Sequence, residues 1–108
     1  MFSSVITMAI YMLYRQKAKD EKRGELDELR EEFEGIYKKY KVDILGFWEN
    51  ADDPNEVYYI SKYEDESDYK SKTEQLRRDE RYAELSKKLE EVRLDFKAFK
   101  LNPIWTSE

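Results

Sequence analysis

Histidine and cysteine are both absent from the 108 residues of this chain. Without histidine the chain has no imidazole to act as a general base, to ligate a metal or to bind a haem iron. Without cysteine it can form no disulfide, no thiolate nucleophile and no zinc site of the cysteine type, which is compatible with a cytoplasmic location. The sequence therefore predicts no metal site and no bound cofactor.

Glycine and proline are scarce as well, with three glycines and two prolines. A phosphate-binding loop needs several closely spaced glycines, so no such loop is expected. Basic residues do not predominate either, because the formal net charge is −5 and the two signs are interspersed. No basic stripe is available for phosphates or anionic lipid, and we therefore expect neither a nucleic-acid partner nor a membrane partner.

Long apolar runs are also missing. The run from Val5 to Tyr14 contains 10 residues, which is half of the roughly 20 that a membrane-spanning helix needs. A secretory signal would carry positive charge before the apolar run, whereas Arg15, Lys17 and Lys19 follow it. The run instead favours a first strand that is apolar on both faces.

Charged residues, by contrast, make up 42% of the chain, and apolar residues make up 40%. An average globular protein has roughly 25% charged residues, and an excess of Glu, Lys and Arg over Asn and Gln indicates a thermophilic source. The apolar residues recur with clear periods, which predicts a folded chain rather than a disordered one. The length suits a single domain that spans residues 1–108.

The stretch from Val42 to Tyr63 predicts a β-hairpin. Two runs of aromatic and β-branched residues, 44–48 and 57–60, flank a type I turn predicted at residues 53–56, with Pro54 at its second position. Neighbouring positions in both runs are apolar, so neither face of the hairpin can be left to water. The acidic residues of the turn lack the spacing and the glycine of an EF-hand, which favours a solvated turn over a cation loop.

Apolar residues at helical spacing predict three helices, over residues 26–40, 67–76 and 82–92. Ser67 is the expected N-cap of the second helix. The apolar stripe changes phase near Asp79, which is a candidate N-cap for the third helix. Alternating residues 93–98 predict a last strand with one face in water.

The resulting order, β-α-β-β-α-α-β, is that of an α+β ferredoxin-like sandwich, in which an antiparallel sheet carries its helices on one face. The helices cover only that face, whereas the first three strands are apolar on both. We therefore expect the bare face to pair with an equivalent sheet in a two-fold homodimer. Burying ~600 Å² of apolar surface per subunit would contribute on the order of 15 kcal/mol before association costs.

Three short segments carry a family resemblance: Leu-Gly-Phe-Trp at 45–48, Asn-Glu-Val at 55–57 leading to Tyr63, and Arg-Arg-Asp at 77–79 with Tyr82. In this order and spacing they resemble the dimeric α+β-barrel proteins, most of all the NIPSNAP-like branch, followed by the antibiotic-biosynthesis monooxygenase branch. The resemblance runs from Ile6 to Leu101. Where the NIPSNAP-like branch tends to carry His and Trp in its third strand, this chain has Tyr59 and Ser61, so an activity that relies on that His is not expected.

The resemblance implies a pocket between the helices and the sheet that binds a small, largely apolar or aromatic molecule. Tyrosine hydroxyls would supply its polar groups. The monooxygenase branch implies oxygenation without a cofactor, although no residue here is a clear general base and no catalytic residue is assigned. The candidate pocket residues are Tyr11, Phe33, Trp48, Tyr59, Tyr63, Tyr69 and Leu76.

The alternative is a non-enzymatic dimeric interaction or stress-related protein in which the same aromatic residues fill the core. A cavity of several hundred Å³ open to solvent would favour the binding protein. A space packed shut by Phe33 and Leu76 would favour the interaction protein.

Overall fold

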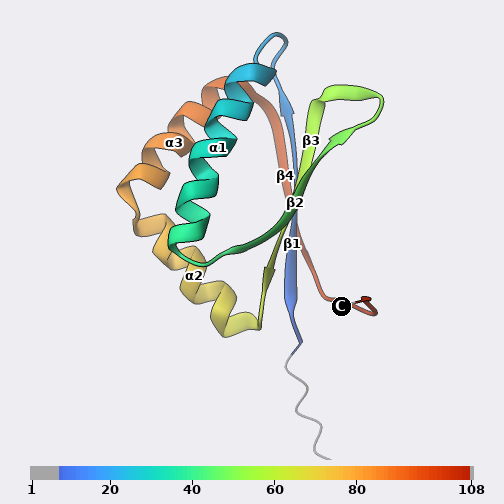
Figure 1. Cartoon of the computed structure of the whole chain (residues 1–108), viewed down its shortest axis with the longest axis vertical. Coiled ribbons are helices and arrows are strands. Elements are labelled where there is room, and N and C mark those ends of the chain that lie inside the picture. The colour runs from blue at the N-terminus through green and yellow to red at the C-terminus, as the bar shows by residue number, and fades with distance from the viewer. Residues whose placement is uncertain (1–7, 108) are drawn as a thin grey trace, which may run out of the picture.

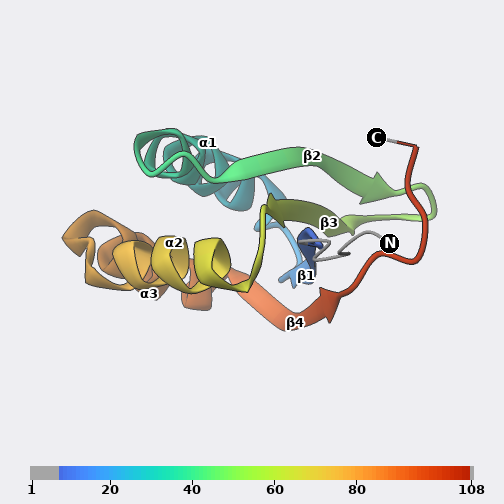
Figure 2. The same ribbon diagram turned by 90° about the horizontal axis from the view of Figure 1, so that it is seen from below.

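The computed structural model of the chain describes residues 8–107. Its described part contains one four-stranded sheet in the order β2-β3-β1-β4, with every neighbouring pair antiparallel. All three helices lie on one side of this sheet, and the segment after the last strand lies on the other (Figures 1 and 2). The elements along the chain are β1 (Ile10–Ala18), α1 (Arg23–Lys39), β2 (Asp43–Asn50), β3 (Asp53–Tyr63), α2 (Glu66–Arg78), α3 (Glu80–Val92) and β4 (Arg93–Leu101). The predicted ferredoxin-like order is confirmed.

The apolar stripes of the helices form the core, as the sequence predicts. α1 buries Leu26, Leu29, Phe33 and Ile36. The third helix, α3, buries Leu85, Leu89 and Val92, whereas α2 buries only Leu76. The weak burial of α2 follows from its position, because α1 and α3 contact each other directly and α2 lies beside them (Figure 1). No helix among residues 8–107 is long and apolar enough to cross a membrane.

Side chains of the sheet alternate between the helix side and a bare side. On the helix side, Tyr14 of β1 lies opposite Tyr59 of β3, which lies opposite Phe47 of β2. The next register row on this side pairs Gln16 with Val57. Strand pairing therefore lines up large rings from three strands beneath the helices.

Asp79 joins the second and third helices, and its predicted role as a cap is confirmed. Its carboxylate accepts hydrogen bonds from the backbone N–H of Tyr82 at 2.8 Å, from the Tyr40 hydroxyl at 2.6 Å and from Lys39 at 3.3 Å. The Tyr40 hydroxyl and the Tyr82 amide hold the pKa of Asp79 at about 2, below its ordinary 3.8. One side chain thus caps α3 and ties it to the end of α1.

Replacing Asp79 by Ala is expected to lower the melting temperature by roughly 5 °C. Because its folded pKa is below its ordinary value, this stabilisation is complete above about pH 4 and is lost as the pH falls towards 2. Thermal unfolding followed by circular dichroism between pH 7 and pH 2 measures both effects. Asp65→Ala is the matched control, since Asp65 caps α2 through the Asp68 amide. This substitution should lower the melting temperature less than Asp79→Ala does. If the difference in melting temperature between wild type and Asp79→Ala were the same at pH 2 as at pH 7, this assignment would be contradicted.

The first strand lies later in the chain than predicted. Residues 5–7 of the predicted strand are outside the described part, and β1 continues through Arg15 and Lys17 to Ala18. These charges are accommodated because Arg15 pairs with carboxylates of both neighbouring strands, Glu56 at 2.7 Å and Asp95 at 2.8 Å. Lys17 likewise pairs with Asp53 at 3.0 Å. Cross-strand ion pairs therefore allow a strand where the local pattern predicts none.

The hairpin is confirmed, but its turn lies at residues 51–52 rather than at 53–56. The Asn50 side chain accepts a hydrogen bond from the Asp52 backbone N–H at 2.8 Å and so closes the turn. Pro54 is tolerated in β3 because pairing with β1 begins only at Glu56, so no hydrogen bond to β1 is required of it.

Two further predictions of detail are wrong. Asp65 rather than Ser67 caps α2, because the Asp65 carboxylate accepts from the Asp68 backbone N–H at 2.8 Å. In β4 every residue after Arg93 is exposed, on both faces, instead of one face being wet. The reason is that β4 is an edge strand. Its Phe96 ring, on the helix side, is therefore left partly uncovered.

Candidate functional site

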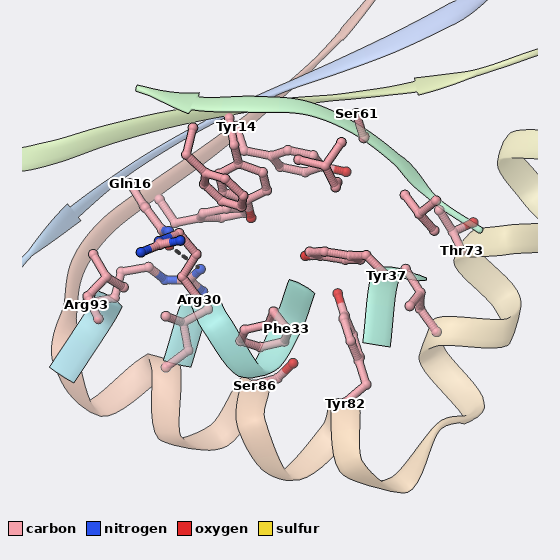
Figure 3. Close-up of a pocket in the computed structure, with 18 of the residues that line it drawn as sticks. Tyr14, Gln16, Arg30, Phe33, Tyr37, Ser61, Thr73, Tyr82, Ser86 and Arg93 are labelled. Atoms are coloured by element: carbon pink, nitrogen blue, oxygen red, sulfur yellow. Dashed lines mark hydrogen bonds between the residues drawn. The ribbon is translucent and has the colours of Figure 1, made fainter. Parts of the chain in front are cut away.

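A cavity of about 360 Å³ lies between the sheet and the helices (Figure 3). All four strands and all three helices contribute side chains to its walls. Exposed side chains, those of Arg77, Glu90 and Phe96, are among the residues that line it. The cavity therefore reaches the protein surface and has a size typical of small-molecule sites.

One wall of the cavity is a row of stacked rings, which we call the aromatic wall: Phe96, Tyr14, Tyr59 and Phe47. The Tyr14 and Tyr59 ring centroids are 4.6 Å apart, Phe47 and Tyr59 are 5.1 Å apart, and Tyr14 and Phe96 are 6.0 Å apart. The interplanar angles lie between 20° and 30°. The wall crosses the sheet from β4 to β2. Because its rings stack on one another, their faces are covered, and a planar ligand in the cavity would pack against ring edges.

The helices supply the opposite wall and several hydroxyl groups. Phe33 of α1 meets Tyr82 of α3 edge to face, with ring centroids 5.5 Å apart. Figure 3 shows the hydroxyls of Tyr37 and Tyr82 pointing into the open space. Burial raises the pKa of Tyr37, Tyr59 and Tyr82. At neutral pH these hydroxyls are therefore protonated and act as hydrogen-bond donors rather than as bases.

One end of the cavity is cationic and contains Arg30, Arg93 and Gln16 (Figure 3). The Arg93 guanidinium donates to the Gln16 side-chain oxygen at 3.5 Å and lies 4.1 Å from the centre of the Phe96 ring. Arg30 pairs with Glu34 at 2.9 Å and lies 5.4 Å from the centre of the Phe47 ring. The two arginines thus cover the two ends of the aromatic wall.

The structure places the seven predicted pocket residues in three groups. Phe33, Tyr59, Tyr63 and Leu76 line the cavity together. Tyr69 does not line it but packs edge-on against Tyr63, with ring centroids 5.2 Å apart. The remaining two, Tyr11 and Trp48, lie on the bare side of the sheet and not in the cavity. That any of these residues binds a ligand stays a prediction.

Tyr11 and Trp48 are misplaced for reasons of strand register. The helix side of β1 carries the even-numbered residues, so Tyr11 faces away and borders an open groove beneath residues 102–107. In β2 the register shifts between Ile44 and Gly46. This bulge turns Phe47 towards the helices and Trp48 towards the bare side, where it lies opposite Tyr58.

Two of the three arginines that line the cavity, Arg30 and Arg93, were not predicted from the sequence, although a signal was present. Arg30 follows Leu26 by four residues and precedes Phe33 by three, so it lies within the apolar stripe of α1. Arg93 follows the buried Leu89 by four residues, at the junction between α3 and β4. A charge on the buried stripe of a helix indicates either an internal partner or a ligand.

No metal site is formed within residues 8–107, where no three His, Cys, Asp or Glu side chains gather. Glu90 is the one carboxylate among the residues that line the cavity, and it is exposed. The arrangement can therefore bind a planar molecule and donate hydrogen bonds to it, but it offers no buried general base.

Residues 11–98 match the sequence profile of the NIPSNAP family. Solved structures with the same fold include a NIPSNAP family protein from Agrobacterium tumefaciens, with 18% identity, a TM-score of 0.80 and coverage of 94% of this chain and 91% of that one. A NIPSNAP-like domain protein from Burkholderia xenovorans has 17% identity, a TM-score of 0.82 and coverage of 95% and 91%.

A candidate antibiotic biosynthesis monooxygenase from Bacteroides thetaiotaomicron also shares the fold, with 16% identity, a TM-score of 0.73 and coverage of 94% of both chains. At this level of identity the likeness concerns the fold alone. Comparison with curated proteins gave no match.

Proposed function

Because the chain belongs to the NIPSNAP family, with its helices and sheet enclosing a cavity, we propose that it binds a small, largely aromatic molecule there. The observation that carries this proposal is the open space of about 360 Å³ beside the aromatic wall. Protein interiors are normally packed without voids of this size, so a filled-core interaction protein would not be expected to keep it. Aromatic ring edges on one side and hydroxyl donors on the other suit a planar ring with a polar substituent.

Titration with a panel of planar aromatic compounds, followed by isothermal calorimetry, tests the proposal. We expect saturable binding of at least one bicyclic compound, with one molecule per chain. Binding should be weaker for an aliphatic compound of equal volume, because it has no aromatic ring to make edge-to-face contacts with the aromatic wall. Failure of every aromatic compound to bind at millimolar concentration would count against the proposal and favour the filled-core alternative.

Oxygenation of the bound ring is the second candidate function. The fold shared with a candidate monooxygenase favours it, as do the two guanidinium groups, which would stabilise the anionic form of an electron-rich phenol. The phenol itself would have to ionise without help, since the cavity offers no buried carboxylate.

Oxygen uptake in the presence of quinols and polyphenols tests this second function. If turnover occurs in the cavity, Tyr59→Phe should alter the rate and Trp48→Ala should not, because Trp48 lies on the other face of the sheet. Absence of oxygen uptake with the whole panel would leave the protein as a binding protein.

We further propose that two chains pair through the bare side of the sheet. One end of this side is polar and neutralised within the chain, because Glu56 accepts hydrogen bonds from Asn50, Tyr58 and Arg15. These contacts, that of Asn50 first, hold the pKa of Glu56 at about 2. The polar end thus needs no further partner.

The other end of the bare side is apolar and partly exposed. Leu13 lies there between Ile60 and Phe99, and the Phe99 and Trp48 side chains are 43% and 49% exposed. A second copy placed against this end would remove these groups from water, as a two-fold dimer does. The cavity lies on the opposite side of the sheet, so each chain of such a dimer would keep its own binding site.

A further inference from the structure

We infer that the ligand of the cavity is an aromatic acid, whose ring packs against the edges of the aromatic wall and whose carboxylate lies between Arg30 and Arg93. This inference rests on the proposed binding function and adds the chemical class of the molecule bound.

Arg93 lies in an environment that leaves its charge without a carboxylate partner. Its side chain is half-buried at the start of β4, and within the described residues it forms no salt bridge with a carboxylate. Its one hydrogen-bond acceptor is the neutral Gln16 side chain at 3.5 Å. Most N–H donors of this guanidinium are therefore unused, in a place where water is partly excluded. Burial also lowers the pKa of Arg93, which indicates that its charge is incompletely compensated.

Most other arginines of the described chain, with the exception of the exposed Arg77, have a carboxylate partner. Arg15 pairs with Glu56 and Asp95, Arg23 pairs with Asp27 and Glu49, and Arg81 pairs with Glu32 and Glu84. The chain has 25 acidic residues, yet none of those described forms a salt bridge with Arg93. An unpaired guanidinium in a cavity wall is therefore a place for an external anion.

The two arginines also lie close to the rings of the aromatic wall. Arg93 lies over Phe96 and Arg30 lies over Phe47, with Tyr14 and Tyr59 between them in the aromatic wall. A planar molecule packed against the edge of Tyr14 would have the guanidinium groups of Arg30 and Arg93 near its own edge, next to Gln16 (Figure 3). A carboxylate is planar and accepts two N–H donors of one guanidinium side by side, which suits this arrangement.

The charge balance of the cavity agrees with an anion. Three arginines line it, Arg30, Arg77 and Arg93, against one carboxylate, Glu90. Arg30 uses one terminal nitrogen for Glu34 and keeps its others for a ligand. A neutral or cationic molecule of the same shape would leave the Arg93 charge uncompensated and should bind less well.

A matched pair of probes tests this inference in the wild-type protein. 2-Naphthoate and 2-naphthamide have the same ring and nearly the same shape but differ in charge. We expect the acid to bind at least about tenfold more tightly in low salt, as charge-assisted hydrogen bonds require. Equal affinities would overturn the inference while leaving the proposed binding function intact, whereas failure of both probes to bind would count against both.

A variant locates the anion site. Arg93→Met keeps an unbranched apolar stem without the charge and should remove most of the preference for 2-naphthoate, with the affinity for 2-naphthamide unchanged within about twofold. Arg78→Met is the control, since Arg78 is exposed and pairs with Glu74 outside the cavity. Equal losses for both probes in Arg93→Met would indicate a structural role and overturn the assignment. If this variant does not fold, Arg30→Met provides the same comparison.

Discussion

Leu13→Glu is expected to convert the proposed dimer into a monomer at micromolar concentration. Leu13 lies in the central strand pair of the bare side, next to Ile60 of β3 and Phe99 of β4. In a two-fold dimer the new carboxylate would be buried twice, once from each chain, without a partner. We expect dissociation to become at least about 100-fold more favourable, because burying an unpaired charge costs several kcal/mol.

Sedimentation equilibrium of both proteins measures this effect. Ala83→Glu is the control, since Ala83 is an exposed apolar residue on α3 and its substitution introduces the same charge. The control should remain dimeric. A wild-type protein that is monomeric at micromolar concentration would contradict the proposed pairing, and so would a Leu13→Glu variant that stays dimeric.

The second large effect is expected from filling the cavity. Ser86 of α3 is half-buried and lines the open space. An indole ring at this position would occupy the volume that the ring of the proposed aromatic acid needs. Ser86→Trp should therefore weaken binding of 2-naphthoate at least about 100-fold, because the indole ring would clash with the ligand ring.

Ala83→Trp serves as the matched control for this variant. It adds the same ring to the same helix at an exposed position and should leave the affinity within about twofold of wild type. Circular dichroism establishes that both variants keep their helices. Unchanged affinity in a folded Ser86→Trp variant would show that the ligand binds elsewhere, for example in the groove bordered by Tyr11.

The helices and the element order could be predicted because they depend on local signals. Leu26, Leu29 and Phe33 repeat with a helical period, and Asp79 stands at the change of phase between two stripes. The limits of β1 could not be predicted, since Arg15 is accommodated in the strand by Glu56 and Asp95, which are distant in sequence. Long-range ion pairs leave no trace in a local hydrophobic pattern.

The cavity was predicted to lie between helices and sheet, but its lining could be predicted only in part. Phe33 and Leu76 lie on helices whose buried face is set by their own period. Strand residues are different, because a single bulge exchanges the two faces, as it does in β2 for Phe47 and Trp48. Choosing the correct face of a sheet that is apolar on both sides requires the three-dimensional register.

The most direct test of the central claim is to locate a bound aromatic acid by NMR. In a complex of the isotope-labelled protein with 2-naphthoate, we expect intermolecular Overhauser effects between the naphthalene protons and the rings of Tyr14, Phe47 and Tyr59. Contacts to Trp48 or Ile60 on the bare side of the sheet, without contacts to the aromatic wall, would contradict the account.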